Sequence, residues 1–288
     1  MKRVFEHYGR TPPDAAWPGG ARLALNFVIN HEEGGERSVP DGDPHSENAL
    51  TEGSTGLPKG RDLAAESMFQ YGSRVGFWRL HGLFTRAGLP CTIFAVAQSL
   101  QRTPQAAAAI RQAGWDVVGH GLRWESHADM DEATERHAVG EATRIIEATT
   151  GHRPQGWYCR YAPSLNTRRI LRELGYSYDS DAYDDELPYW DDGHLVIPYT
   201  LVNNDVRFQR AAITTGEDFF TYIMGGIEMA LAEPGSRMLS VGLHNRIIGH
   251  PARAIGLKRI LDAVKAMPEV WVCRRLDIAR HWMETHAP

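Results

Sequence analysis

The sequence predicts an α/β protein built on one barrel-like parallel sheet. Short apolar runs typical of buried strands alternate with helix-like segments, glycines end several of those segments, and polar residues directly follow several of the strand-like runs. In parallel α/β folds, the reactive residues lie at the carboxyl ends of the strands. The 288 residues are enough for one large domain. We expect a single domain over 1–288, with an irregular arm at 1–20 and a long loop at 37–63.

The first predicted strand, 23–29, leads into the most informative segment of the chain. Its residues are apolar on both faces, which is typical of a strand buried in a parallel sheet. Glu32 and Glu33 follow it and precede two glycines. Neighbouring residues at a strand end point in different directions, so one carboxylate can polarise water while the other holds a neighbour or a metal. The alternative is a solvated acidic loop.

The remaining elements alternate along the chain. Ser73 can begin a helix that Gly88 ends, and glycines likewise end the helices that follow. We expect strands at 91–96, 115–119, 155–158, 176–178, 195–198, 238–242 and 270–272, and helices at 73–87, 103–114, 131–150, 166–174, 251–267 and 276–283. This alternation is typical of a parallel sheet with crossover helices.

Polar side chains follow five of the predicted strands, so we expect them to converge on one edge of the sheet. His120 lies between two glycines that allow a ligand to approach the backbone, and His244 is a candidate general acid toward a leaving nitrogen. Arg160 can hold an anionic or carbonyl oxygen, or it can form a structural ion pair with a nearby aspartate. The five sets are Glu32 with Glu33, His120, Arg160, Asp179 with Asp181, and His244.

Several aromatic side chains near these strand ends could form a pocket for a small planar ring, although for any single one of them a place in the core is the more frequent outcome. They are Trp124, Trp157, Tyr158, Tyr183, Tyr189 and Trp190. Cys159 could act as a nucleophile only with a histidine base beside it. The metal signal is weak, because the fourth residue after His120 is Trp124 and the next histidine is His127.

Composition excludes several classes of protein. The formal net charge is −5 and no basic block stands out, so we expect no nucleic-acid partner. No apolar run approaches about 18 residues, so we expect no membrane span. The three dispersed cysteines, Cys91, Cys159 and Cys273, form neither a disulfide framework nor a CxxC motif. These observations favour a cytoplasmic protein.

Eight segments carry a resemblance that covers the full length of the chain: 8–13, 17–22, 30–36, 71–74, 119–124, 166–169, 178–183 and 271–275. Through them the sequence resembles the polysaccharide deacetylase-like superfamily and, within it, the metal-independent branch of allantoinases and cyclic-imide hydrolases. The resemblance implies a distorted (β/α) barrel and hydrolysis of a carbon–nitrogen bond that is not a peptide bond.

The resemblance also implies roles for single residues. Glu32 and Glu33 match the two aspartates that end the first strand of the sugar deacetylases, where one is the base and the other a metal ligand. His120 matches the first histidine of the family's His-x-x-x-His metal pair, and Trp124 stands where the second would be. His244 matches the general acid. Arg160, with Pro163 close behind it, matches the family's arginine.

From these observations we expect ring-opening hydrolysis of a small cyclic ureide or imide such as allantoin, without a cofactor. The expected catalytic residues are Glu32, Glu33, His120 and His244, and the expected substrate-binding residues are Arg160, Trp124, Trp157, Tyr158 and Asp181. One alternative is a zinc-dependent amino-sugar N-deacetylase, with Glu33 and His120 as metal ligands. Another is an inactive barrel that only binds a small molecule. The long arm and loop favour a homo-oligomer.

Overall fold

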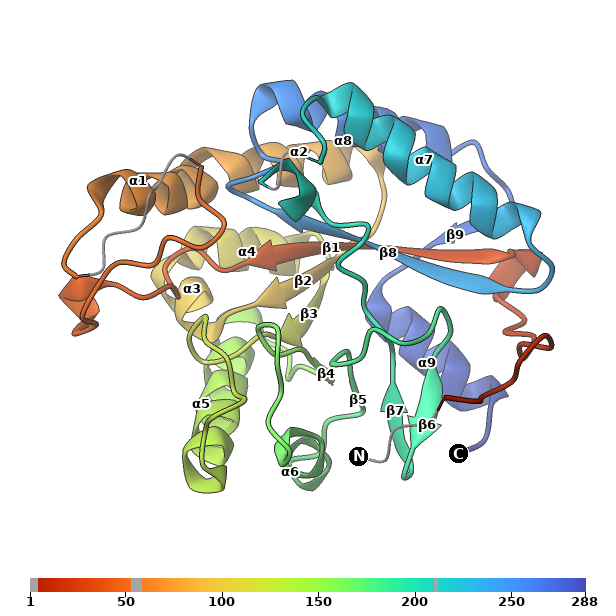
Figure 1. The fold of residues 1–288 in the computed structure, drawn as a ribbon, viewed down its shortest axis with the longest axis horizontal. Helices are drawn as coiled ribbons and strands as arrows, with labels where there is room; N and C mark the ends of the chain where they lie inside the picture. Colours follow the sequence, from red (N-terminus) through yellow and green to blue (C-terminus); the bar gives the residue numbers. More distant parts are fainter. Residues whose placement is uncertain (1–4, 53–58, 210–211) are drawn as a thin grey trace.

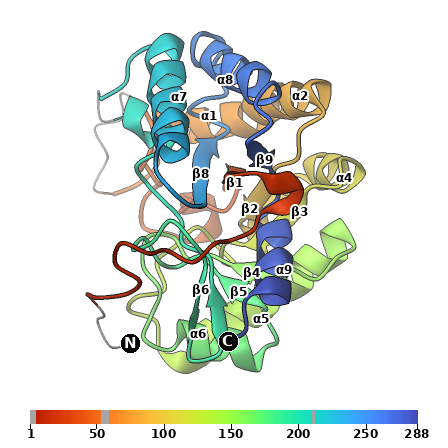
Figure 2. The same cartoon turned by 90° about the vertical axis from the view of Figure 1, so that its right-hand side faces the viewer.

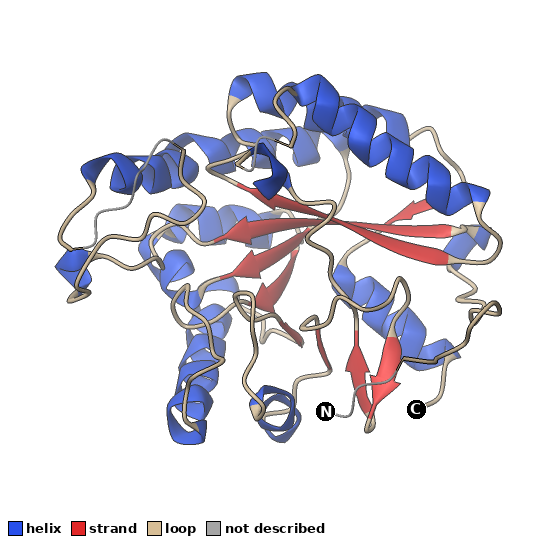
Figure 3. Ribbon diagram, viewed as in Figure 1, coloured by secondary structure: helices blue, strands red, loops and turns tan. Residues whose placement is uncertain are grey.

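The computed structural model describes residues 5–52, 59–209 and 212–288. The first four residues of the expected arm, and 53–58 of the expected loop, lie outside the described residues. Within these ranges a curled mixed sheet has the strand order β6-β7-β5-β4-β3-β2-β1-β8, with β9 also paired to β1 (Figures 1 and 3). The strands are β1 (Leu23–His31), β2 (Thr92–Ala95), β3 (Asp116–Gly119), β4 (Gly156–Trp157), β5 (Tyr178–Asp179), β6 (Tyr189–Asp191), β7 (His194–Val196), β8 (Arg237–His244) and β9 (Val270–Val272).

The strand pairing confirms the expected distorted α/β barrel. All the paired strands run parallel except β6 and β7, which form an antiparallel hairpin at one edge. The sequence patterns did not predict β6, because Tyr189, Trp190 and Asp191 are only half-buried and show no strand-like apolar run. The carboxyl ends of β1, β2, β3, β4 and β8 therefore lie along the same edge of the sheet.

Strand β1 lies at the centre and is buried along its whole length, as its apolar pattern predicts. Leu25 and Phe27 point into the layer between the sheet and the helices, whereas Ala24 and Val28 point into a second apolar cluster on the opposite face. In the register of β1 with β8, Asn30 lies opposite His244. This pairing brings the residues that follow β1 close to the end of β8.

The helices lie around the sheet, and α2, α7 and α8 form one layer over β1 and β8 in both views (Figures 1 and 2). They are α1 (Leu63–Tyr71), α2 (Phe77–Ala87), α3 (Ala97–Arg102), α4 (Pro104–Gln112), α5 (Glu132–Thr150), α6 (Thr167–Glu173), α7 (Gly216–Ala232), α8 (Pro251–Val264) and α9 (Arg275–Thr285). Within the described ranges, no helix combines the length and apolar character that a membrane span requires.

Two helical predictions need correction. The helix expected from Ser73 begins ten residues earlier, because the Asp62 side chain accepts the Ala65 N–H and caps α1. A π turn at Gly72–Gly76 then joins α1 to α2. Helices α3 and α7 were not predicted, although Thr215 caps α7 through a reciprocal hydrogen-bond pair with Asp218. Two consecutive glycines in its middle obscure the helical signal, and packing against α8 stabilises it instead.

Candidate active site

A small cavity lies at the carboxyl edge of the sheet, with a volume of about 60 Å³. The ends of β1, β3, β4 and β8 form its floor, and segments 47–52 and 199–206 form part of its wall. Its lining combines carboxylate, imidazole, guanidinium and amide groups with aromatic and aliphatic surface. The lining residues are Asn30, Glu32, Leu50, His120, Trp124, Tyr158, Arg160, Tyr161, Tyr199, Leu201, Asn204, Val206 and His244.

Glu32 lies at the centre of this site and is almost completely buried. Its Oε1 lies 3.3 Å from Nε2 of His120 and 3.6 Å from Nε2 of His244, and its Oε2 accepts a 2.8 Å hydrogen bond from Nη2 of Arg246. Burial alone would raise the pKa of Glu32, but the positive charges of His244 and Arg246 outweigh it and hold the pKa well below its usual range. Glu32 is therefore a carboxylate at neutral pH.

His244 is held in a fixed orientation by Asp205. Its Nδ1 lies 2.6 Å from Oδ1 of Asp205, and the other oxygen of Asp205 accepts the backbone N–H groups of His244 and Ile248. Burial lowers the pKa of His244, but Asp205 and Glu32 reverse this effect and raise it above its usual value. Because a carboxylate only accepts hydrogen bonds, Nδ1 carries a hydrogen, and the protonated ring also presents an Nε2–H to the cavity.

His120 approaches Glu32 from the side of β3. Its Nδ1 donates a 2.9 Å hydrogen bond to the Tyr158 carbonyl, which can only accept. Nε2 therefore donates to Glu32 only when the ring is protonated, and otherwise offers a lone pair. The ring stacks on Tyr158, with centroids 5.0 Å apart.

Glu33 does not line the cavity, contrary to the catalytic role expected from the sequence. Its side chain points the other way from that of Glu32, accepting a 2.8 Å hydrogen bond from Asn245 and a 3.2 Å hydrogen bond from Nη1 of Arg246. It also packs against Gly72 so closely that a Cβ there would lie 2.4 Å from the Glu33 carboxylate. The Arg246 guanidinium thus links the two glutamates, and Glu33 balances its charge.

Three of the five residues expected to bind substrate line the cavity, namely Trp124, Tyr158 and Arg160. The Arg160 guanidinium stacks 3.6 Å from the centre of the Trp124 ring, and its Nη1 donates to Glu47 at 2.8 Å and to the Trp124 carbonyl at 2.7 Å. It does not pair with Asp179, which binds Arg168 instead. The long loop contributes Leu50 to this wall, and Glu47 of the same loop holds Arg160.

Trp157 and Asp181 lie outside the cavity, so the structure does not support their expected contact with substrate. Trp157 points to the opposite side of the chain from Tyr158, is completely buried and packs against Tyr176. Asp181 accepts the backbone N–H of Cys159 at 2.7 Å. Burial and the neighbouring Asp179 raise the pKa of Asp181 to about 8.

The remaining aromatic candidates and Cys159 do not line the cavity. Tyr183 is half exposed and its hydroxyl lies 2.8 Å from that of Tyr158, while Tyr189 and Trp190 belong to the distant strand β6. Cys159 is completely buried, and burial raises the pKa of its thiol well above the usual value. A buried thiol in this state is a poor nucleophile.

The sequence reasoning missed several residues of the site. Arg246 follows His244 by two positions, and that proximity was the available signal. Asp205 gave none, because it precedes β8 by more than thirty residues and meets His244 only in the folded chain. The other missed lining residues are Asn30, Leu50, Tyr161, Tyr199, Leu201, Asn204 and Val206.

The residues around the cavity do not fit the metal ion considered from the sequence. Of the proposed ligands, His120 contacts Oε1 of Glu32, and Glu33 is already bound by Arg246 and Asn245. In the described part of the chain, one group of three ligand atoms lies within 4.8 Å of one another, and none of its members lines the cavity. The Arg246 guanidinium contacts both glutamates, so the positive charge beside them comes from a side chain.

Comparison with known proteins places this geometry in a family context. The polysaccharide deacetylase family model matches residues 60–178. A putative polysaccharide deacetylase of Schizosaccharomyces pombe is 34% identical over 94% of this chain and 93% of its own length.

Solved structures resemble the whole chain. The crystal structure of PuuE allantoinase has 44% identity and a TM-score of 0.95, covering 100% of this chain and 99% of its own. That of a probable polysaccharide deacetylase from Pseudomonas aeruginosa PAO1 has 45% identity and a TM-score of 0.94, covering 99% of both chains. A putative polysaccharide deacetylase from Mycobacterium smegmatis shares the fold, with 24% identity, a TM-score of 0.80 and 95% coverage of both chains.

Proposed function

The chain belongs to the polysaccharide deacetylase family, and on this basis we propose that it opens a small cyclic amide, an allantoin-like ureide or imide, by hydrolysis. The observation that carries this proposal is that Glu32 and His244 line the same small cavity, where Oε1 of Glu32 lies 3.6 Å from Nε2 of His244. A carboxylate and a protonated imidazole in this arrangement provide a general base and a general acid. The likeness to PuuE allantoinase supports the same reaction class.

In the proposed mechanism, Glu32 accepts a proton from water as the water oxygen attacks a ring carbonyl carbon. The carbonyl oxygen becomes an oxyanion, to which the Arg160 guanidinium or protonated His120 donates; one such donor is typically worth about 3 kcal/mol. His244 then donates its Nε2 proton to the departing ring nitrogen as the carbon–nitrogen bond breaks. One water is consumed, and the ring opens to a carboxylic acid, which ionises, and an amide or ureide.

The shape and lining of the cavity favour a small ring over a polymer. Its volume of about 60 Å³ is small beside the cavities of about 810 and 900 Å³ elsewhere on the surface. Trp124, Tyr158 and Tyr161 supply flat apolar surface that suits a planar heterocycle. Each charged lining residue has an oppositely charged neighbour, which suits a neutral substrate.

A second candidate is N-deacetylation of an acetylated amino sugar. The names of the relatives from Schizosaccharomyces pombe and Pseudomonas aeruginosa favour it. The same base and acid would serve, because an acetamide is also cleaved at a carbon–nitrogen bond. The two candidates differ in the size of the substrate and, for the zinc-dependent form considered from the sequence, in the need for a metal.

A turnover screen separates these functions. Cyclic ureides, cyclic imides and acetylated amino sugars are offered to the wild-type protein with and without a chelator, and ring opening that survives chelation is expected. Glu32→Gln and His244→Ala should each lower kcat by about 10² to 10⁴-fold, the usual contribution of general acid–base catalysis. Glu284→Gln and His137→Ala, which change exposed residues on α9 and α5, are the matched controls.

The alternative results have distinct meanings. Near-wild-type rates in both site variants would disprove the mechanism. Deacetylation that requires added metal would favour the second candidate. Binding of a ring compound without turnover would indicate an inactive small-molecule-binding barrel.

A further inference from the structure

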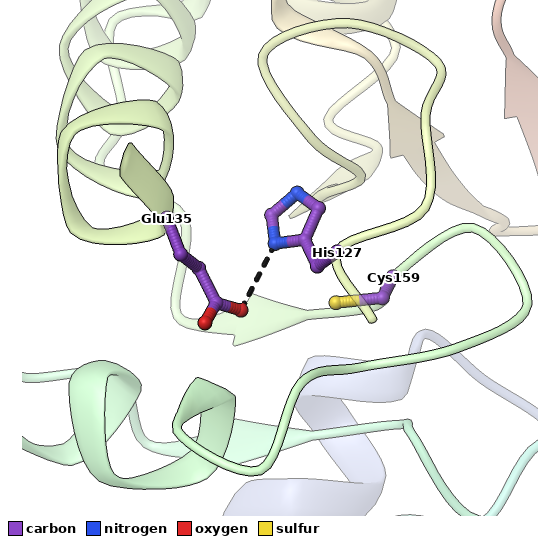
Figure 4. Close-up of side chains that lie close together, drawn as sticks. All are labelled: His127, Glu135 and Cys159. Carbon is purple, nitrogen blue, oxygen red and sulfur yellow. Dashed lines mark hydrogen bonds and ion pairs between the residues drawn. The ribbon is translucent and has the colours of Figure 1, made fainter. Parts of the chain in front are cut away.

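A buried carboxylate outside the cavity connects two of the loops that form its wall. Glu135 lies in the first turn of α5, is completely buried and does not line the cavity. Its carboxylate lies 3.1 Å from Nδ1 of His127, and a dashed line marks this contact in Figure 4. It also accepts hydrogen bonds from the hydroxyls of Ser164, at 2.5 Å, and Thr167. Glu135 therefore has three partners on two separate segments.

Those segments carry the substrate-facing side chains. The first loop, 120–131, follows β3 and supplies His120 and Trp124 to the cavity. The second loop, 158–166, follows β4 and supplies Tyr158, Arg160 and Tyr161. Glu135 binds the first loop through His127, and the second through Ser164 and through Thr167 at the adjoining start of α6.

The second loop needs such support. Tyr161 has a φ of 62°, which is a left-handed backbone conformation that residues other than glycine seldom adopt. Its neighbour Arg160 reaches the first loop by donating to the Trp124 carbonyl, and Ala162 accepts the His127 N–H at 3.3 Å. The two loops thus contact each other beside the cavity and are both bound to Glu135 behind it.

We propose that Glu135 is a positioning residue that fixes the two loops relative to each other and so sets the shape of the substrate cavity. Three donors converge on one buried carboxylate, which cannot move without leaving them unpaired. The part of this inference that concerns substrate affinity rests on the proposed function. The part that concerns loop order does not.

The same side chains raise the question of a metal site, because ligand atoms of His127, Glu135 and Cys159 lie within 4.8 Å of one another. The hydrogen bonds instead favour a cluster in which these side chains bind one another without a metal ion. Both Glu135 oxygens already accept hydrogen bonds, and the Cys159 sulfur accepts one from the Trp157 indole at 3.2 Å. Nε2 of His127, which has no hydrogen-bond partner among the described residues, points away from Glu135 and Cys159 in Figure 4.

Amide hydrogen exchange tests the loop connection directly. Glu135→Ala should raise the exchange rates of amides in both 120–131 and 158–166 by tenfold or more, and Glu135→Gln should restore much of the protection because its amide oxygen still accepts the hydroxyl hydrogens. Thr143→Val is the matched control: Thr143 is equally buried on α5, but its hydroxyl bonds to Val139 and Tyr176. Thr143→Val should leave the amide exchange rates of both loops unchanged.

Kinetics on a substrate found in the turnover screen supply the second readout. Glu135→Ala should raise KM about tenfold and lower kcat as well, because the proposed oxyanion donors His120 and Arg160 stand on these two loops, and Glu135→Gln should recover most of both losses. If no substrate is found, the proposed function fails, and hydrogen exchange still decides the role of Glu135.

Two further variants keep the test decisive if Glu135→Ala does not fold. His127→Phe removes the bond from Glu135 to the first loop, and Thr167→Val removes one of its bonds to the second. The double variant should raise the amide exchange rates by less than the sum of the two single effects. Exchange rates equal to those of the control, or additive effects of the two variants, would overturn the inference. So would one equivalent of bound metal in the wild-type protein that both Glu135→Ala and Cys159→Ser lose.

Discussion

The protonation states in the cavity depend on a few buried charged residues. Arg246 contacts both glutamates and, together with the positive charge of His244, keeps Glu32 ionised. Asp205 does the opposite for His244 and keeps it protonated. The base and the acid therefore hold the protonation states that hydrolysis needs at the same pH. Removing one member of such a buried set leaves the remaining charge uncompensated.

The activity of the protein should fall on the alkaline side of its pH profile. The proposed general acid must be protonated, so activity should fall as pH rises through the raised pKa of His244. Asp205→Asn removes one of the charges that raise this pKa, so the alkaline limb should move to lower pH. Activity at pH 8 should drop by about 10²-fold, a usual size for losing acid catalysis.

The measurement is kcat against pH for the wild-type protein, Asp205→Asn and Asp262→Asn, the last being an exposed aspartate on α8. An alkaline limb that stays in place in Asp205→Asn would show that another group controls it. The acidic limb should not report Glu32, whose pKa lies well below its usual range.

At the level of secondary structure, the π turn between α1 and α2 brings a helix backbone against the loop that carries Arg246. A Cβ on Gly76 would lie 2.0 Å from the Asn245 carbonyl oxygen. A Cβ on Gly249 would lie equally close to the same oxygen. This contact fixes the backbone on which Asn245 and Arg246 reach Glu33.

Gly76→Ala should therefore destabilise the protein by about 1–3 kcal/mol, the usual cost of overpacking a tight contact. The control is Gly140→Ala in α5, where a Cβ would meet nothing within 4 Å, so it should stabilise the helix by about 0.5–1 kcal/mol. Urea unfolding measures both changes. Equal stability of the two variants would show that the contact at Gly76 relaxes freely.

At the level of the whole molecule, the parallel sheet places the ends of distant strands on one edge. The same packing buries titratable side chains beside those strand ends. Asp181 is such a group: one of its oxygens has no hydrogen-bond partner among the described residues, and its pKa is raised to about 8. Between its usual pKa of 3.8 and about 8, the folded chain holds a proton that the unfolded chain has lost. Stability must therefore fall as pH rises through this window.

Asp181→Asn removes this titration, so the variant should gain stability relative to the wild-type protein as pH rises from 4 to 8, with little further gain above. Each pH unit inside the window contributes at most about 1.4 kcal/mol. Unfolding free energies at pH 5, 7 and 9 measure the trend, with the exposed Asp192→Asn as control. A pH-independent difference between wild type and Asp181→Asn would contradict it.

The sequence by itself determined the fold class and the edge of the sheet where the cavity lies. The apolar run of β1 marked a strand buried on both faces, and parallel strands necessarily bring their ends to one edge. That is why Glu32, His120, Arg160 and His244, each placed after a predicted strand, meet around one cavity. These inferences depend on local periodicity, which a single sequence displays directly.

Only the tertiary structure decided which neighbour of each pair faces the cavity and which distant residues support it. Glu32 and Glu33, like Trp157 and Tyr158, differ in direction because a strand alternates, and the twist of the sheet selects the side. Asp205, Arg246 and Glu135 act through contacts between segments far apart in the chain. Such contacts form when the whole core packs, so no short sequence pattern records them.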